Sequence, residues 1–588
     1  MKITKKKFLF LIGKLSIVFI LFGFWIGLFI DFEVAVNNEK VTLWCHAPSV
    51  IEVDEDFEIV IEAWDSFERV AGSYAGKVSF NIESYNYTTL ESLSAVSVLP
   101  ENYTFTTNYI WGGIFPAYKF TGADNGRKSF QMNITTPGIH YIKIIESNGN
   151  SYRSNPIIVK PIGTIKNRLY WGDIHGHTMY SDGSGLPAEA YEFARDVACL
   201  DYAALTDHSE NFLRIGDIDI FNIFQNYIDI TNSYNNEEKF ITLVALEWTP
   251  KYVVLGGDVS YGHINVYFKG NTMPFFSTLT QRTPYELYDH ISKTTTDFIA
   301  WSHHTLKTQF LSDFAFYNES INRMIEIYSV HGCCECTGTD NIFPQADGID
   351  GIDDYGYSIR DALRMGRKFG IMSSSDTHDG RLGHPISHTE ARCFNQYPYT
   401  LSGYRVNHPY PGGLTGLYTP SLNRSLIYDA LNNRSGYAST WIKRPYLEFR
   451  INGLSVGEND STVYVENKTI ERHIEILACA DGVSMRPNYN SNISKINIYK
   501  NSELWKTFEN ISEPCFYRNN ITDDKNITGT NYTHFIQKAD GYYINEKSLL
   551  PVNRSEMNTD GADYYYVRIQ DSNSGVSWIG PIWVEPKN

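Results

Sequence analysis

The stretch that decides how this chain is interpreted is Leu169-Tyr170-Trp171-Gly172-Asp173-Ile174-His175-Gly176-His177. Its apolar start is typical of a buried strand, and side chains two apart on a strand lie on one face. His175 and His177 are therefore expected to point the same way at the strand's end. Neutral imidazoles are ligands for divalent metals. The pair alone is a weak signal, because many such pairs are surface residues. Whether these two histidines bind a metal is therefore judged from the rest of the chain.

Further imidazoles and carboxylates follow other apolar runs downstream. They are Asp207-His208, Glu247, His263, His303-His304, Glu326 and Asp376-Thr377-His378. Eleven of the sixteen histidines lie within residues 175–388, and the main candidates each come after a separate apolar run. The pattern predicts a hydrolytic metal site built from several strand ends.

Residues 164–444 alternate strand-like runs with amphipathic segments. Tyr202-Ala203-Ala204-Leu205 precedes Asp207, for example, and residues 186–199 carry a helical apolar stripe. Strand, ligand and helix in repetition is the pattern of a parallel β/α barrel, which carries its functional residues at the carboxyl ends of strands. We therefore expect an α/β barrel here.

The flanking segments have the two-residue alternation of β-strands. Phe57, Ile59 and Ile61 alternate with acidic residues, and residues 32–163 are predicted to form an immunoglobulin-like β-sandwich. Residues 445–588 return to the same alternation and are predicted to form a second β-sandwich. A length of 588 residues fits three or four domains.

The N-terminus differs in composition from the rest. Lys5-Lys6-Lys7 precedes an apolar run over residues 8–30. As a helix this run spans about 34 Å, enough to cross a bilayer. Residues 1–31 are thus predicted to be a basic stub and a transmembrane anchor, with the bulk of the chain outside the cytoplasm. A cleaved signal peptide is the alternative. Asn-x-Ser/Thr tripeptides, as at Asn86, would then mark glycosylation sites.

The composition narrows the expected partners. The chain has 50 basic and 67 acidic side chains, a net charge of −17, which argues against nucleic acid bound through a basic patch. We expect a small-molecule or ester substrate, and contact with a membrane through the N-terminal helix. The cluster Cys333-Cys334-x-Cys336 has no second cysteine pair beside it, so it indicates a disulfide or local packing more than a thiolate metal site.

Several segments in combination resemble the PHP (polymerase and histidinol phosphatase) superfamily, and within it the DUF3604 and CehA/McbA-type metallohydrolases. They are Tyr170 to Thr178 with Ser181-Asp182-Gly183, Leu205 to His208, Glu326 to Gly332, and Ser374 to His384. The resemblance covers about residues 165–588. It implies a distorted (β/α)7 barrel that holds two or three divalent ions: zinc, manganese or iron.

The same resemblance assigns metal ligands to positions of this chain: His175, His177, His208, Glu247, His263, Asp376 and His378. One of His303 and His304 fills the next position. The family often has His-Pro there, so the choice stays open, with His303 preferred. Asp182 falls near the place where some members supply another ligand, and Asp207 is expected to orient a ring.

The chemistry expected of such a site is hydrolysis. Two divalent ions would lower the pKa of a shared water toward neutrality. Asp376 or Glu247 would move a proton, and His331, Arg381 and His384 are candidates for leaving-group protonation or substrate binding. The sequence predicts an extracytoplasmic, membrane-anchored metal-dependent hydrolase that acts on a phosphoester or a carboxyl or carbamate ester. A catalytically silent surface binding protein is the alternative, and a polymerase-linked exonuclease fits the charge poorly.

Overall fold

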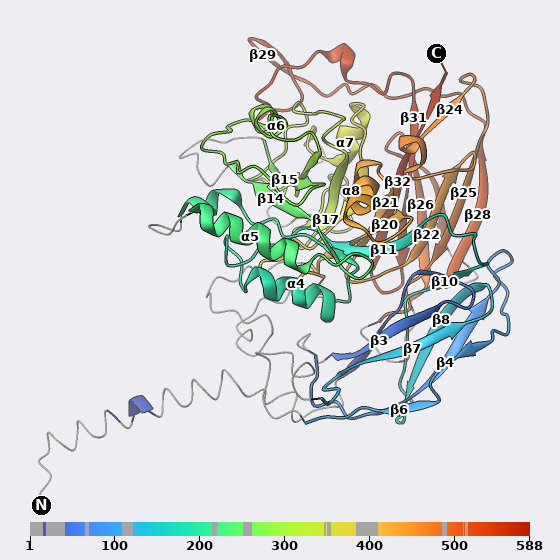
Figure 1. Ribbon diagram of the computed structural model, residues 1–588. Helices are drawn as coiled ribbons and strands as arrows, with labels where there is room; N and C mark the ends of the chain where they lie inside the picture. The colour runs from blue at the N-terminus through green and yellow to red at the C-terminus, as the bar shows by residue number, and fades with distance from the viewer. Residues whose placement is uncertain are drawn as a thin grey trace, which may run out of the picture.

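The computed structural model describes residues 14, 16–18, 41–64, 70–108, 122–214, 220–250, 261–345, 348–349, 354–383, 410–484, 488, 491–509, 511 and 515–587. Strands dominate these residues. Figure 1 shows the N-terminal sheets in blue below the long C-terminal strands in orange and red, with the central segments in green and yellow beside them. The helices are few: α4 (Pro187–Asp196), α5 (Ile220–Tyr234), α6 (Pro284–Ser292), α7 (Ile359–Arg364) and α8 (Arg424–Asn432).

Two sheets make up the N-terminal region. The first has the order β1 (Thr42–His46), β3 (Asp56–Trp64), β7 (Arg127–Ile134) and β5 (Ser97–Val98). The second has the order β2 (Val50–Glu52), β10 (Ile157–Lys160), β8 (Gly138–Glu146), β4 (Lys77–Tyr85) and β6 (Asn102–Thr104), with β9 (Ser151–Arg153) on β8. Ile59 and Ile61 of β3 and Ile142 and Ile144 of β8 are fully buried in one core. Burial of alternate side chains from both sheets is what stabilises this region.

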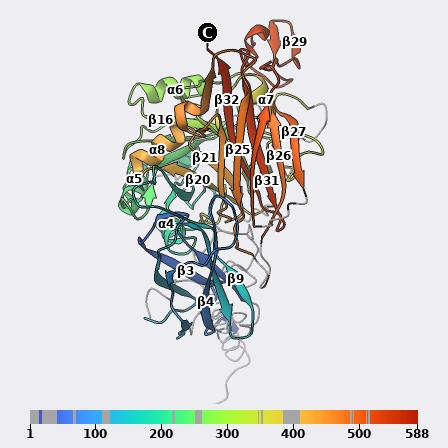
Figure 2. The same cartoon turned by 90° about the vertical axis from the view of Figure 1, so that its right-hand side faces the viewer.

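A ten-stranded sheet runs through the central and C-terminal regions. Its order is β13 (Ile241–Thr242), β12 (Tyr202–Ala203), β11 (Arg168–Asp173), β20 (Gly413–Thr419), β21 (Gly436–Thr440), β32 (Val576–Pro586), β31 (Asp563–Asp571), β26 (Ile493–Lys500) and β27 (Glu503–Glu509), with β24 (Thr462–Val465) on β32. Figure 2 shows its C-terminal strands face on. The sheet thus ties the strand that precedes His175 to strands about 400 residues later.

Smaller sheets complete the structure. One is β14 (Val244–Trp248), β15 (His263–Phe268) and β16 (Phe298–His303), antiparallel throughout. Another is β18 (Gly332–Cys333), β17 (Met324–Ser329) and β19 (Gly370–Ser373), in which β17 and β19 are parallel. The C-terminal region adds β23 (Leu454–Ser455), β22 (Tyr446–Ile451), β25 (Arg472–Cys479) and β28 (Phe516–Asp523), and the hairpin of β29 (Ile536–Lys538) and β30 (Gly541–Tyr543).

The predicted parallel (β/α)7 barrel is wrong, and the fold is β-rich. The strands that carry the predicted site residues belong to three separate sheets, and β14, β15 and β16 run antiparallel. The apolar runs in the sequence identified buried strands correctly. A strand that is apolar on both faces does not reveal its direction or its sheet, so the strand-and-helix alternation was misread as parallel.

The predicted membrane anchor needs correction too. Residues 8–30 lie outside the described residues, apart from residues 14 and 16–18. Within the described part of the chain no helix is both long and apolar enough to cross a bilayer. The longest, α5, has 15 residues, whereas a span needs about 20. On this finding the predicted transmembrane helix and the single-pass location in a cell membrane are wrong.

Candidate metal centre

The first and last histidine motifs are held together by one buried carboxylate. Asp173, the last residue of β11, accepts hydrogen bonds from the backbone N of Ser375 at 2.9 Å and of Gly383 at 2.8 Å. The backbone N of Asp376 in turn donates to the carbonyl of His175 at 2.9 Å. Burial raises the pKa of Asp173 to about 6. Segments 200 residues apart are thereby fixed side by side.

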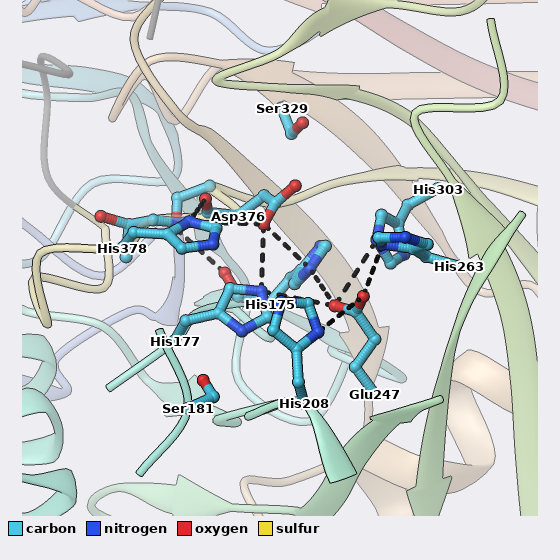
Figure 3. Close-up of polar contacts among 12 residues, drawn as sticks. His175, His177, Ser181, His208, Glu247, His263, His303, Ser329, Asp376 and His378 are labelled. Atoms are coloured by element: carbon cyan, nitrogen blue, oxygen red, sulfur yellow. Dashed lines mark hydrogen bonds and ion pairs between the residues drawn. The ribbon is translucent and has the colours of Figure 1, made fainter. Parts of the chain in front are cut away.

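Glu247 of β14 lies at the centre of the cluster (Figure 3). Its carboxylate is fully buried and faces five imidazoles. Oε2 lies 3.3 Å from Nε2 of His175 and of His177 and 3.5 Å from Nε2 of His303, and Oε1 lies 2.8 Å from Nδ1 of His263 and 3.2 Å from Nδ1 of His208. Both oxygens of Glu247 thus have imidazole nitrogens beside them, so this carboxylate and these imidazoles could together hold divalent cations.

Asp376 is the second central carboxylate. Its Oδ1 lies 3.2 Å from Nε2 of His175 and 3.2 Å from Nε2 of His177, while its Oδ2 lies 3.1 Å from Nε2 of His331. The residue has a φ of 56°, in the left-handed region that Asp tolerates better than most residues. Strained backbone of this kind is typical of functional sites.

Asp182 closes one end of the cluster. Its Oδ1 lies 3.4 Å from Nε2 of His208 and 3.4 Å from Nε2 of His378. The ring of His177 stacks between these two rings, with centroid distances of 4.4 Å and 4.2 Å. Together the four residues offer ligand atoms within 4.8 Å of one another.

In three imidazoles Nδ1 lies within hydrogen-bonding distance of an acceptor of the protein, and these contacts indicate which ring nitrogen is left for a cation. Nδ1 of His175 is 2.8 Å from a carboxylate oxygen of Glu326, and Nδ1 of His378 is 3.1 Å from the carbonyl of Asp376. Nδ1 of His208 is 2.7 Å from the hydroxyl of Thr249, which itself donates to Glu247 at 2.9 Å. With Nδ1–H donating to these acceptors, Nε2 is the nitrogen that each ring could offer to a cation in place of a proton.

The pair His303-His304 supplies a third group together with His263, with ligand atoms again within 4.8 Å. Nε2 of His263 and Nδ1 of His304 are buried and have no hydrogen-bond partner among the described residues. His303 approaches Glu247, whereas the ring of His304 packs on those of His263 and His331, at 4.8 Å and 5.3 Å. Buried nitrogens in this state, beside carboxylates, fit a divalent cation.

The electrostatics agree with that fit. Burial alone would raise the pKa of Glu247 and of Asp376, but the surrounding imidazoles, His208 and His175 foremost, hold both pKa values well below the usual range. Burial likewise opposes the charging of His175, yet the carboxylates around it keep its pKa well above the ordinary value. The carboxylates are thus ionised, which is the form that a cation requires.

The remaining predicted residues lie in different places. His331 is buried against Asp376, and burial is the main cause that lowers its pKa to about 4. Arg381 is also buried, but its guanidinium pairs with Asp379 and not with a carboxylate of the cluster. His384 lies outside the described residues.

One charged residue at the centre was not singled out from the sequence. Lys307 places its Nζ 3.1 Å from Nδ1 of His331. Its one sequence signal is that it follows His303-His304 by three residues.

Asp207 was expected to orient a ring, and the structure places it under the loop that carries Asp182. It accepts from the backbone N and the hydroxyl of Thr178 at 2.7 and 2.8 Å, and from the hydroxyl of Ser181 at 2.5 Å. In Asp207→Asn an amide N–H replaces one acceptor, so we expect metal affinity about 10- to 100-fold weaker with the fold intact. Competition with a chelating dye measures this. The exposed substitution Asp229→Asn on α5 is the control, and equal affinities in both variants would refute the role.

Comparison with known proteins establishes no family. No family model matches the chain. An uncharacterized protein of Chlamydia muridarum is 22% identical over 549 residues, 92% of this chain and 73% of that protein. One of Chlamydia trachomatis is 22% identical over 461 residues, 76% of this chain and 62% of that protein. Among solved structures, a β-glucuronidase of Parabacteroides merdae has a TM-score of 0.19 at 7% identity, over 93% of this chain and 65% of that one. Such values support no inference about fold or activity, and the family resemblance stays a prediction.

Proposed function

We propose that this protein is a metal-dependent hydrolase that cleaves a phosphoester or a carboxyl or carbamate ester. The observation that carries the proposal is the set of imidazoles whose Nδ1–H groups are held by Glu326, Thr249 and the carbonyl of Asp376. Nε2 of His175 then faces Glu247 and Asp376, and Nε2 of His208 and of His378 faces Asp182. Histidines that bind a metal commonly donate their other ring N–H to a carboxylate, a carbonyl or another fixed acceptor.

The chain's own residues then have distinct tasks. Divalent cations held by the histidines, Glu247 and Asp376 would supply Lewis acidity and lower the pKa of a bound water. Asp376 places Oδ2 3.1 Å from Nε2 of His331, where it could accept a hydrogen bond from an attacking water. His331 lies between Lys307 and Asp376, with a ring nitrogen 3.1 Å from each, and would hold Asp376 in position.

Metal content and turnover test the proposal together. We expect two or more divalent ions per chain, and hydrolysis of members of a panel of phosphate and aryl esters. His177→Ala should lose both, because His177 contacts Glu247 and Asp376. The exposed His473→Ala is the matched control and should behave as the wild type. A folded, metal-free wild type would end the proposal, and a metal-loaded protein with no turnover would favour the silent binding protein.

A further inference from the structure

Three side chains of metal-ligating type meet where the N-terminal sheet packs on the central region, outside the metal centre described above. His46 is the last residue of β1, Glu62 lies in β3, and Cys199 follows α4. Each of them offers one ligand atom, and these atoms lie within 4.8 Å of one another. Figures 1 and 2 both show α4 beside the blue sheet that contains β3. Two regions of the fold therefore contribute to one cluster.

The pairing of β1 with β3 brings two of these side chains to one face of the sheet. Trp44 stands opposite Glu62 in the register of these strands, and His46 is two residues beyond Trp44. Side chains two apart on a strand share a face. Trp44 is buried in the same apolar cluster as Val197, the residue that caps the end of α4. The face that carries His46 and Glu62 thus packs against the turn that leads to Cys199.

Nε2 of His46 is a buried polar atom that the surrounding side chains do not satisfy. His46 is 5% exposed, and this nitrogen has no hydrogen-bond partner among the described residues. Oε2 of Glu62 lies 3.7 Å away, too far for a hydrogen bond, and already accepts from Nε1 of Trp64 at 3.1 Å. A buried polar atom costs free energy unless it has a partner. A divalent cation between this nitrogen and Glu62 would be a partner for both.

Arg127 of β7 is the rival of a cation in this cluster. Its Nε lies 3.3 Å from Oε1 of Glu62, and its Nη2 lies 4.0 Å from Sγ of Cys199. This guanidinium can balance the charge of Glu62 without a metal. It nevertheless leaves Nε2 of His46 without a hydrogen bond, so the ion pair alone does not account for the three side chains.

We propose that His46, Glu62 and Cys199 bind a zinc ion that joins the N-terminal sheet to the central region. An imidazole nitrogen, a carboxylate oxygen and a thiolate sulfur are the ligand types of zinc, and a water would complete its usual four positions. Cys199 is half-buried, so the site is open to an incoming ion. Its thiol donates to the carbonyl of Val197 at 3.6 Å, and the ion would replace that proton. This site is separate from the one that the proposed function uses.

Cobalt(II) is the probe for the test, because a cobalt–thiolate bond absorbs by charge transfer in the near ultraviolet. The ligands proposed around Glu247 are imidazoles and carboxylates, which give no such band. The full chain, dialysed against cobalt(II), should show the band, and Cys199→Ser should lose it and hold about one ion less per chain. The matched control is Cys515→Ser, which should keep the band. Cys515 is also half-buried and also lies beside a guanidinium, with Nη1 of Arg153 3.1 Å from its Sγ.

His46→Phe is the second variant, and it keeps the thiolate and the shape of the ring. It should weaken cobalt binding by at least about 10-fold, since even the loss of an outer partner of a ligand has that effect. Circular dichroism shows that each variant is folded. A wild type without the band, or a band that Cys199→Ser retains, would overturn the zinc site and leave Arg127 as the partner of Glu62. Either result leaves ester turnover and the ions at Glu247 untouched, so the proposed function is decided by its own test.

Discussion

The Glu247→Gln protein is expected to fold normally, to hold fewer divalent ions per chain than the wild type, and to lose about 10³-fold in kcat/KM. Glutamine has the shape of glutamate, so the packing of β14 is retained. It lacks the negative charge that faces five imidazoles, and its amide N–H₂ replaces one of the two oxygens. An amide nitrogen is no ligand for a cation, so the site would lose one ligand atom together with the negative charge.

Metal content by mass spectrometry and steady-state kinetics measure the two parts of this prediction. Circular dichroism shows whether the fold is intact. The exposed Glu238→Gln makes the same chemical change on the surface and should match the wild type in every respect. A Glu247→Gln protein with full metal content and normal turnover would show that this carboxylate does not join the cations.

Candidate ligands could be picked out from the sequence because imidazoles and carboxylates that follow apolar runs are a local pattern. Buried apolar runs were predicted before His175, Asp207 and Glu247; in the structure β11 ends at Asp173, β12 ends at Ala203 and Glu247 lies within β14. The direction of the strands could not be predicted, because the apolar pattern of β14 and β15 is the same in a parallel and in an antiparallel sheet. The barrel prediction failed at this point.

Contacts that depend on loop geometry were harder to predict from the sequence than the direction of the strands. Asp182 looked like a turn residue beside Gly183, and the turn is what delivers it to His208. A Cβ on Gly183 would lie 2.4 Å from the carbonyl oxygen of His177, so the turn needs glycine to come this close. Lys307 had no periodicity to reveal it. Its position beside His331 becomes visible only when the loop after β16 is placed against that ring.

Glu335 carries the second large effect, on stability. It is a fully buried carboxylate after β18 that joins the central region to the C-terminal sheet. It accepts from Arg360 of α7 at 2.6 Å, from Arg568 of β31 at 2.9 Å, and from the side chains of Trp578 and Tyr566 at 2.8 Å each. Glu335→Gln would leave two buried guanidinium groups with the partly exposed Asp340 as their remaining carboxylate partner, so we expect a loss of about 3 kcal/mol in the free energy of unfolding.

The pH dependence of the free energy of unfolding separates the charge of Glu335 from its packing, because a loss of packing alone would not change with pH. Burial opposes the charge of Glu335, but Arg360 and Arg568 outweigh it and lower its pKa from 4.5 to about 2. A carboxylate with a lowered folded-state pKa stabilises the fold above its unfolded value and loses that contribution as the pH falls from about 4.5 toward 2. This shift corresponds to about 3 kcal/mol, close to the cost expected for the substitution.

Urea unfolding at a series of pH values should therefore show the wild type well above Glu335→Gln at pH 7, with the gap closing below about pH 4. The control is Glu503→Gln, because Glu503 pairs with Arg364 but is 78% exposed. Exposed pairs contribute about 0–1 kcal/mol, so this variant should stay near the wild type at every pH. A gap of constant size from pH 7 to pH 2.5 would mean that shape, and not the charge of Glu335, holds the two regions together.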